Sequence, residues 1–405
     1  MRSLLGRFHR PNARSQSEQL FMLNSLGDGS TLSLDFTTGV LDPRLTFTRS
    51  TTGTYIGSDG LIKTMAAAPT NDPTKARFDY DPITLTPRGL LIEGAASNLA
   101  TNSNLQAGWL GGSNTTVTAN TSEVTSPDGT NNAAKIALTN AGYCSRFESI
   151  TGLAASTAHT FSYWIRGTAG NQQRVYSVTA GADLVTQTTL SYSTTGWTRV
   201  QINFTTTAAI SNVYIYVASR PTGTASDVIY VYGCQLEVGT GASSLIPTGA
   251  STGFRAADEC QLLNLTTMGF NASEGTIYTD VGVRQNTGSQ RNYTFLPASG
   301  SNNQIFEGSG IALNVYSSGS FVAQIGTSLL SASKIAAGYA VNDYAVSING
   351  AAVVTDTSGA LPSSLTKLTI GGSIVNASAY ANGCIRTFKY WPTRLPNAQL
   401  QALTT

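Results

Sequence analysis

The sequence predicts an all-β protein in which two β-sandwich domains follow an extended N-terminal arm. Only 11% of the 405 residues are charged and 41% are hydrophobic, and 55 threonines and 43 serines accompany 40 glycines. β-Branched residues and tyrosines between clusters of Gly, Ser and Asn are typical of short strands and turns. Glu and Lys are too scarce for long helices, and no apolar run is long enough to span a membrane.

The clearest strands lie between residues 99 and 238. Hydrophobic and polar residues alternate with a period of two in 160–166 and 200–204, which predicts strands with one buried face. Segments 212–217 and 227–232 instead carry Val and Ile on one face and Tyr on the other. Several short strands at this spacing predict a sandwich or jelly roll.

The remaining chain divides around this unit. Residues 31–98 form a β-rich leading segment, in which prolines mark turns or the ends of short strands. Gly, Ser and Pro residues predict a linker at 239–258, and a second strand-rich unit follows at 259–405. We therefore expect one sandwich on each side of the linker.

Two local motifs of the second unit are more specific. Asn349-Gly350 predicts a tight hairpin turn, because both residues tolerate positive φ. Residues 396–403 predict one short helix, with Asn397 as its N-cap.

The net charge of +2 is located in the arm, residues 1–30. This arm carries four arginines and two acidic residues, so the rest of the chain is neutral and has no general attraction for nucleic acid or an anionic membrane. It lacks the apolar core of a signal peptide. Two hypotheses remain open: the arm attaches the protein to a partner, or it is a solvated tail. The arginines are Arg2, Arg7, Arg10 and Arg14.

Four cysteines allow two interpretations. Cys144, Cys234, Cys260 and Cys384 form no CxxC pair and have no nearby histidine, so no metal site is expected. The favoured interpretation is four buried free thiols. The alternative pairs the first two and the last two, which keeps each disulfide inside one domain.

No catalytic site or cofactor is expected. Only His9 and His159 are present, which leaves little material for a catalytic triad or a zinc site. The GxSxG string at 249–253 lacks the preceding strand and following helix of a nucleophile elbow. A glycosidase needs two carboxylates flanking the scissile bond, and the acidic residues of 259–405 form no close cluster. The sequence therefore predicts that the protein is not an enzyme.

Short motifs of the leading segment occur in a recognisable order. Together they resemble the segment that precedes a jelly roll in a family of tailed-phage virion proteins, the tail-fibre, tailspike and head-fibre adhesins. The motifs are Phe47-Thr-Arg49-Ser50, Gly60-Leu61-Ile62, Ala76-Arg77-Phe78-Asp79-Tyr80, Gly89-Leu-Leu-Ile-Glu93 and Ser97-Asn98-Leu99.

The resemblance extends over about residues 31–405. Tyr232-Gly-Cys-Gln-Leu-Glu237, with Ile246-Pro-Thr248 downstream, is similar to the closing strand and exit of a carbohydrate-binding-module-like jelly roll. The C-terminal unit resembles a concanavalin-A/laminin-G-like sandwich. The matching segments there are 335–339, 346–350, 368–372 and 382–390, with Arg394-Leu395 and Gln399-Leu400.

The tyrosine-bearing strands suggest a binding surface. An aromatic platform on one sheet could stack against a sugar ring, because tyrosine combines a broad apolar face with a polar tip. Two arginines could donate hydrogen bonds at its rim. The alternative is that both faces of these strands are buried, one in the core and one under a neighbouring domain. The candidates are Trp164, Tyr214, Tyr216, Tyr230 and Tyr232, with Arg166 and Arg220.

The resemblance implies a phage structural protein, a fibre, tail or head appendage, located in the virion. Its expected partners are other virion proteins, reached through the arm, and host-surface polysaccharide, with a homo-oligomer also plausible. No membrane insertion and no specific nucleic acid are expected. Two alternatives remain: a ligand-free capsid or collar decoration, and a polysaccharide depolymerase. Fold analogy alone does not separate these functions.

Overall fold

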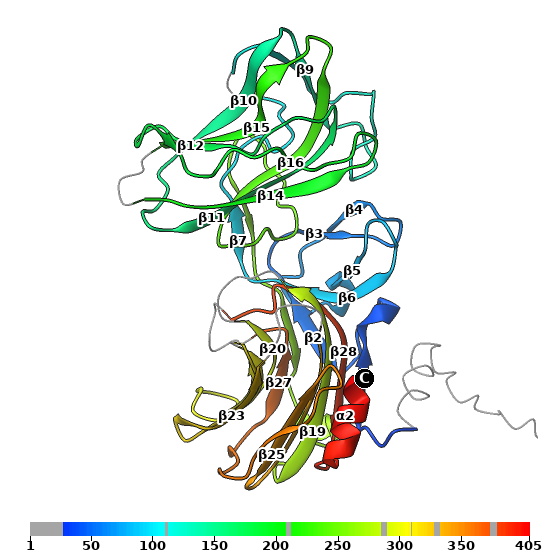
Figure 1. Cartoon of the computed structure of the whole chain (residues 1–405). Helices are drawn as coiled ribbons and strands as arrows, with labels where there is room; N and C mark the ends of the chain where they lie inside the picture. The colour runs from blue at the N-terminus through cyan, green and yellow to red at the C-terminus, as the bar shows by residue number, and fades with distance from the viewer. Residues whose placement is uncertain are drawn as a thin grey trace, which may run out of the picture.

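The computed structural model describes residues 27–109, 112–207, 212–284, 290–308, 310–327, 333–372 and 379–405. It confirms the all-β fold class: antiparallel sheets make up two sandwiches, one above the other in Figure 1. The four arginines of the arm, Arg2, Arg7, Arg10 and Arg14, lie outside the described residues.

The first sandwich, which we call the jelly-roll module, contains two sheets. One has four strands in the order β10-β15-β12-β13, and the other has five in the order β14-β11-β16-β9-β8. Their inner faces enclose a core of aliphatic and aromatic side chains. The strands are β8 (Thr115–Thr118), β9 (Ala134–Leu138), β10 (Gly142–Thr151), β11 (Ala158–Gly167), β12 (Val175–Ser177), β13 (Ala182–Asp183), β14 (Thr198–Thr205), β15 (Asn212–Gly223) and β16 (Val228–Val238).

The second sandwich, the C-terminal sandwich, is built from both ends of the chain. An eight-stranded sheet runs β26-β25-β24-β19-β28-β6-β5, with β1 also paired to β28, and a seven-stranded sheet runs β2-β18-β27-β20-β21-β22-β23. The strands from the leading segment are β1 (Leu32–Asp35), β2 (Leu45–Thr48), β5 (Arg77–Tyr80) and β6 (Pro87–Ile92). The others are β18 (Glu259–Leu262), β19 (Glu274–Arg284), β20 (Arg291–Leu296), β21 (Gln304–Gly308), β22 (Ile311–Ser317), β23 (Ser320–Thr327), β24 (Ser333–Ala340), β25 (Asp343–Ile348), β26 (Val354–Asp356), β27 (Lys367–Ile370) and β28 (Gly383–Trp391).

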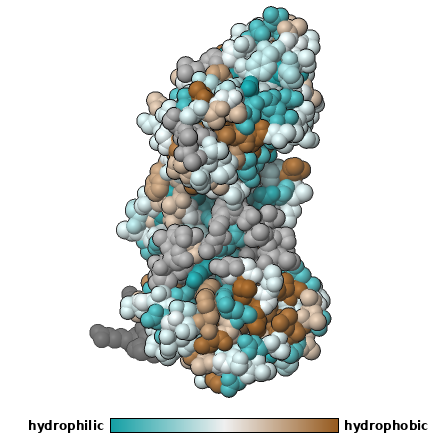
Figure 2. Space-filling model, turned by 60° about the vertical axis from the view of Figure 1, so that its left-hand side comes forward, coloured by the Kyte–Doolittle hydropathy of each residue, from teal (hydrophilic) through white to brown (hydrophobic). Residues whose placement is uncertain are grey.

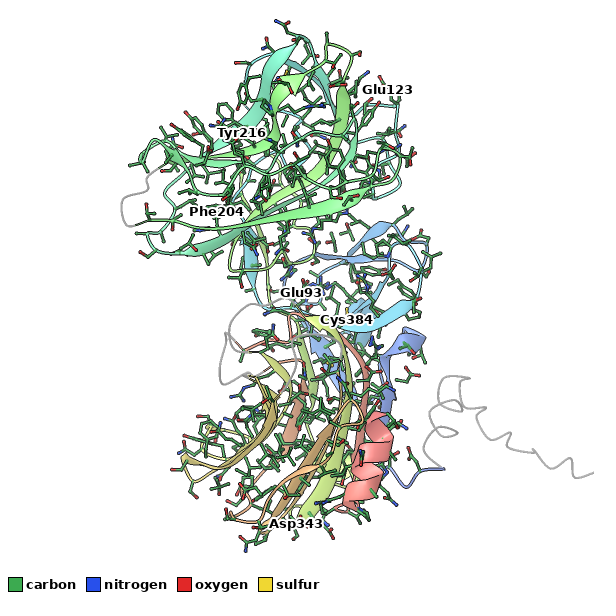
Figure 3. The ribbon with its side chains drawn as sticks, viewed as in Figure 1. Glu93, Glu123, Phe204, Tyr216, Asp343 and Cys384 are labelled. Carbon is green, nitrogen blue, oxygen red and sulfur yellow. The ribbon has the colours of Figure 1, made fainter. Side chains whose placement is uncertain are left out.

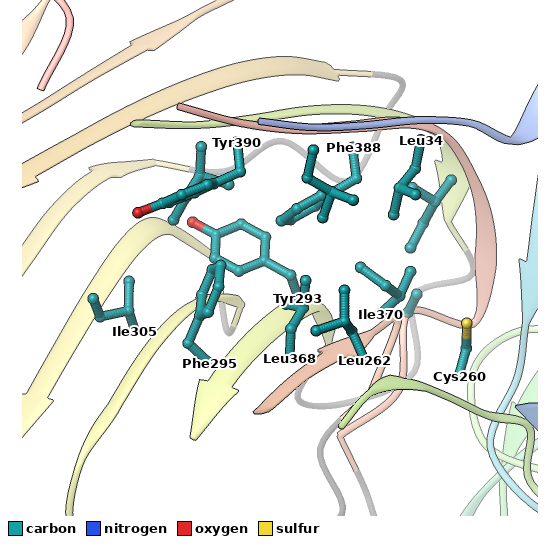
Figure 4. Packing of buried hydrophobic residues seen from close by; sticks show 14 of the residues in the cluster. Leu34, Cys260, Leu262, Tyr293, Phe295, Ile305, Leu368, Ile370, Phe388 and Tyr390 are labelled. Carbon is teal, nitrogen blue, oxygen red and sulfur yellow. The ribbon is translucent and has the colours of Figure 1, made fainter. Parts of the chain in front are cut away.

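The leading segment is therefore not a separate unit before the first sandwich. Its strands β6 and β2 pair with β28 and β18, so they cover backbone groups that would otherwise be unpaired sheet edges. Leu34 of β1 lies in one hydrophobic cluster with Phe388 and Tyr390 of β28 (Figure 4). The C-terminal sandwich is thus completed by residues more than 200 positions upstream in the sequence.

Smaller elements connect these sheets. The hairpin β3 (Gly53–Ile56) and β4 (Ile62–Met65) and the pair β7 (Ala96–Asn98) and β17 (Gly253–Arg255) lie between the sandwiches. Three 3-10 helices are η1 (Phe36–Thr38), η2 (Pro73–Lys75) and η3 (Leu265–Met268). The short helix α2 (Asn397–Thr404) ends the chain.

The local motifs can now be compared with the structure. Asn349 and Gly350 have φ of 49° and 73°, which confirms the predicted tight turn after β25. The predicted terminal helix is present, but Pro396 occupies the N-cap, so the assignment of Asn397 to that position is wrong by one residue. Proline fixes φ just before the first turn, where no donor is needed.

All four cysteines are buried free thiols, as favoured, and the alternative disulfide pairs are not formed. Burial raises the pKa of each thiol: Cys144, Cys234, Cys260 and Cys384. Buried neutral thiols pack as small apolar groups.

Buried charges lie at the junction of the two sandwiches. Asp258 accepts from Arg49 at 2.9 Å and from Arg77 at 2.5 Å, and Glu93 pairs with Arg77 at 2.8 Å and Arg255 at 3.2 Å. These side chains are at most 2% exposed. We call these five residues the junction network. Figure 3 places Glu93 between the two sandwiches.

The junction network strongly favours the ionised form of the Glu93 carboxyl group. Burial alone would raise the pKa of Glu93, but Arg255 and Arg77, with hydrogen bonds from Ser244, lower it to about 2. Asp258 also accepts the backbone N–H of Glu93 at 2.9 Å. Paired, hydrogen-bonded charges of this kind are costly to disrupt one partner at a time.

The predicted linker at 239–258 is therefore an ordered part of the junction. It supplies Arg255, Asp258 and Ser244, whose amide donates to Glu93 at 2.7 Å. Its composition of Gly, Ser and Pro predicts a linker, and short side chains are also compatible with close packing around a buried ion network. Asn98 adds to this order, donating to the carbonyls of Cys234 at 3.0 Å and Ile246 at 2.9 Å.

Next to this network, Asp79 provides a test of pH dependence. Burial raises its pKa to about 6, against weaker effects of the Ile56 amide and Arg88, and Glu93 raises it further. The folded-state pKa of Asp79 lies above its unfolded-state pKa, which is near 4. Its carboxyl group therefore contributes fully to stability below pH 4, and this contribution is lost as the pH rises through 6. Asp79→Asn should therefore increase the free energy of unfolding at pH 8 by up to about 3 kcal/mol.

Asparagine keeps an acceptor for the Ile56 amide, which lies 2.7 Å from Asp79. At pH 3 the variant and the wild type should be about equally stable, because Asp79 is then mostly protonated in both the folded and the unfolded states. Chemical denaturation at pH 3 and pH 8 measures the difference. An equal gain at pH 3 and pH 8 would contradict titration of Asp79 as the cause.

Candidate functional site

The seven predicted binding residues do not form one platform. Tyr214 and Tyr216 lie on β15 of the four-stranded sheet. Trp164 lies on β11, and Tyr230 and Tyr232 lie on β16 of the five-stranded sheet. The two groups therefore belong to opposite sheets of the jelly-roll module.

Trp164 and Tyr232 pack under the leading segment, as the alternative interpretation proposed. Their rings lie 6.0 Å apart, edge to face, in a cluster with Ile62 and Leu245. Tyr232 is 4% exposed. These two rings form part of the interface between the jelly-roll module and the leading segment.

The predicted rim residues are also occupied within the chain. Arg220 is buried, pairs with Asp227 at 3.0 Å and donates to the Ala169 carbonyl at 2.8 Å. Arg166 lies over the ring of Trp197 at 5.9 Å from its centroid. Tyr230, on the same sheet, donates its hydroxyl to Glu123 at 2.8 Å.

The four-stranded sheet, in contrast, presents aromatic rings on its outer face. In the register of β12, β15 and β10, Tyr176 stands opposite Tyr214, and Phe147 opposite Tyr216. The rings of Phe147 and Tyr214 are stacked, with centroids 4.3 Å apart, and Tyr176 lies 6.3 Å from Tyr214. Figure 3 shows Tyr216 on this side of the jelly-roll module.

Arg174, which precedes β12, completes this surface. Its guanidinium carbon lies 4.8 Å from the ring centroid of Tyr216 and 5.2 Å from that of Tyr176. It donates to Asp183 of β13 at 2.8 Å and to the hydroxyl of Tyr143 at 2.5 Å. We call Phe147, Arg174, Tyr176, Tyr214 and Tyr216 the aromatic face.

The electrostatics of the aromatic face suit hydrogen bonding rather than acid–base chemistry. Burial raises the pKa of Tyr216 to about 12, so its hydroxyl stays protonated at neutral pH. Burial alone would lower the pKa of Arg174, but its hydrogen bond to Asp183 raises it. Across the described part of the chain, no group of three or more His, Cys, Asp or Glu residues could hold a metal ion.

Sequence reasoning identified Tyr214 and Tyr216 but missed Phe147, Tyr176 and Arg174. The register shifts between Arg146 and Phe147 in β10, which interrupts the period-two alternation that would reveal the strand. Strand β12 has only three residues, too few for a periodicity signal.

A cavity in the leading segment lies elsewhere in the molecule. A hollow of about 820 Å³ is lined by the leading segment, including Tyr55, Phe78 and Tyr80, with Asp59 and Lys63. The last two form an ion pair at 2.6 Å and are each more than a third exposed. This cavity is separate from the aromatic face and from the junction network.

No family model matches this chain. No curated protein matches it either. None of the described helices is long and apolar enough to cross a membrane.

Solved structures give weak similarities. The CBM22-1 xylan-binding domain of Paenibacillus barcinonensis Xyn10C is 12% identical over 36% of this chain and 96% of its own, with a TM-score of 0.27. The tandem CBM22-1–CBM22-2 domain of the same protein is 9% identical over 74% of this chain and 97% of its own, with a TM-score of 0.28. A Bacteroides thetaiotaomicron protein, provisionally described as sugar-binding, is 11% identical over 35% of this chain and 99% of its own, at 0.26. At these scores, the likenesses carry no argument about function.

Proposed function

We propose that the protein binds glycans through the aromatic face of its jelly-roll module. The observation that supports this is the group of Phe147, Tyr176 and Tyr214, half-buried on an outer sheet face rather than in the core. A sugar ring offers an apolar C–H face and a rim of hydroxyls. Aromatic rings provide a matching apolar surface, and tyrosine hydroxyls and a guanidinium provide the polar contacts.

The polar partners of this face are already held in place. Arg174 is fixed by Asp183 and Tyr143, and Asp183 also accepts from Gln187 at 2.6 Å. A preorganised guanidinium loses less side-chain entropy when it donates to a ligand hydroxyl. Weak individual sites suffice when many copies act together on one particle.

We propose further that these domains are displayed on a phage virion, as a fibre, tail or head appendage, and bind host-surface polysaccharide there. The motifs from Phe47 to Leu99 support this, through their resemblance to phage adhesins. In this proposal the arm, with Arg2, Arg7, Arg10 and Arg14, attaches the chain to other virion proteins. A ligand-free decoration protein and a depolymerase are the competing outcomes.

A glycan array on the full-length protein tests the proposal, with the double variant Tyr176→Ala/Tyr214→Ala. The variant should weaken binding at least about tenfold, equivalent to about 1.4 kcal/mol, because both stacking surfaces are lost. The matched control is Phe254→Ala, which removes an exposed ring on β17, outside the aromatic face. This control should bind like the wild type.

Three results would point elsewhere. A silent array supports the decoration protein. Release of reducing ends from a polysaccharide supports the depolymerase. Binding that survives in the folded double variant contradicts the aromatic face as the site.

A further inference from the structure

The seven-stranded sheet of the C-terminal sandwich carries mostly polar residues on the face turned away from its core, and several of them are buried, among them Thr294, Asn314 and Thr369. Its cross-strand register places one residue from each strand in a single row. Six of the seven are neutral and polar, and the seventh is Phe306. From β2 to β23 the row is Thr46, Gln261, Thr369, Thr294, Phe306, Asn314 and Gln324.

The strands β21, β22 and β23 add an aromatic corner to this row. Phe306 and Phe321 have ring centroids 6.4 Å apart, and Tyr316 packs edge to face on Phe321 at 5.0 Å. Phe321 is 52% exposed, so its ring is accessible to a ligand. Figure 2 shows hydrophobic surface gathered on the C-terminal sandwich.

Arg291 covers this corner. Its guanidinium carbon lies 3.7 Å from the ring centroid of Phe306, closer than any other arginine–aromatic pair in the described chain. Its Nη1 donates to the side-chain oxygen of Gln304 at 2.5 Å and to Thr294 at 3.5 Å. Gln304 is fixed in turn by donating to the Ser301 carbonyl at 2.8 Å.

The charge of Arg291 has no carboxylate partner among the described residues. Burial lowers its pKa to about 10, with no acidic group opposing that effect, so it remains charged at neutral pH. Within the same residues, its Nε and Nη2 donate no hydrogen bond. Arg49, Arg77 and Arg255 are more buried, and each has a carboxylate partner. An unpaired, partly desolvated guanidinium is a cost that an anionic ligand would remove.

We propose that this corner, formed by Arg291, Gln304, Phe306, Phe321 and Gln324, is a second glycan-binding surface that selects sugars carrying a carboxylate. The choice of a sugar as ligand rests on the proposed function, whereas the selection for negative charge follows from Arg291. Nε and Nη2 of Arg291, which donate no hydrogen bond to the described residues, would match the two oxygens of a carboxylate. The exposed ring of Phe321 and the amide of Gln324 would contact the rest of the sugar.

The test uses the full-length protein with oligosaccharides of galacturonate, glucuronate and mannuronate, and the same oligosaccharides after reduction of their carboxyl groups. Calorimetric titration should show at least about tenfold tighter binding of one or more acidic probes than of its reduced form. Raising the salt concentration should weaken that binding, because the contact is ionic.

Two variants separate charge from geometry. Arg291→Gln should abolish the preference for acidic probes, and Arg291→Lys should restore it only partly, because lysine keeps the charge but loses the planar fork. The control is Arg88→Gln, which removes an arginine that is 44% exposed and pairs with Asp81 at 2.8 Å in the leading segment. It should keep the preference.

The outcomes distinguish this proposal from the first. Both surfaces are supported if Tyr176→Ala/Tyr214→Ala no longer binds neutral glycans and only Arg291→Gln loses the preference for acidic ones. If acidic probes bind through Arg291 and the aromatic face binds nothing, only the proposed function of the jelly-roll module fails. Failure of every acidic probe to bind more tightly than its reduced form, or an unchanged preference in Arg291→Gln, overturns the second surface.

Discussion

Replacing Asp258 by alanine should lower the free energy of unfolding by about 3–5 kcal/mol. The change removes the carboxylate shared by Arg49 and Arg77, both of which have fully buried side chains. It also leaves the Glu93 amide, 2.9 Å from Asp258, without its acceptor. Arg49 then loses its carboxylate partner, and Arg77 keeps only Glu93, which it shares with Arg255, in a place where water cannot solvate the charges.

Denaturation by guanidinium chloride, followed by tryptophan fluorescence, measures this loss. Trp109 and Trp164 lie in the jelly-roll module and Trp391 lies in the C-terminal sandwich, so the signal reports on both. Because the junction network lies between the two, we expect Asp258→Ala also to split the unfolding curve into two transitions.

The matched control is Asp343→Ala. Asp343 pairs with Arg394 at 2.9 Å but is 54% exposed, so its loss should cost less than about 1 kcal/mol. If both variants lose the same small amount, the junction network does not stabilise the contact between the sandwiches.

The same network explains why the leading-segment motifs are present. Arg49, Arg77 and Glu93 each stand within one of the motifs that carried the resemblance, and Asn98 follows in the next. All four form buried hydrogen bonds at the junction. Their arrangement is therefore accounted for by architecture, and the proposed glycan-binding role rests on other residues.

Strands were predicted most accurately where hydrophobic and polar residues alternate regularly. Segments 160–166 and 200–204 lie within β11 and β14, because one buried face imposes a period of two. Pairing partners could not be predicted. Leu32 of β1 pairs with Tyr390 of β28, and nothing local to either strand encodes a partner so distant in the sequence.

The candidate site was predictable only in part, for a related reason. Alternation assigns a residue to one face of its own strand, which correctly separated Tyr214 and Tyr216 from the core valines of β15. It does not say to which sheet a strand belongs. The tyrosines of β15 and β16 therefore look equivalent in sequence, although those of β16 lie on the other sheet.

Replacing Gly89 by alanine should lower the free energy of unfolding by about 4 kcal/mol, because backbone strain and a steric clash add together. Its φ is 99°, a conformation that alanine adopts only with strain. A Cβ atom there would overlap the carbonyl oxygen of Ile385 and lie 2.8 Å from its carbon and 2.9 Å from Cα of Arg386. All these atoms belong to the backbone of β28, so no side chain can move aside.

A second glycine separates the two causes. Gly142 has a similar φ of 114°, but a Cβ atom there would have no neighbour within 4 Å. Gly142→Ala should therefore cost only the strain, about 1–3 kcal/mol. Thermal and chemical denaturation of both variants measures the difference, which is the cost of pushing β6 away from β28. Since β6 leads directly to Glu93, the excess loss in Gly89→Ala should also weaken the junction network. Equal losses in the two variants would show that the close approach of β6 to β28 adds nothing beyond backbone strain.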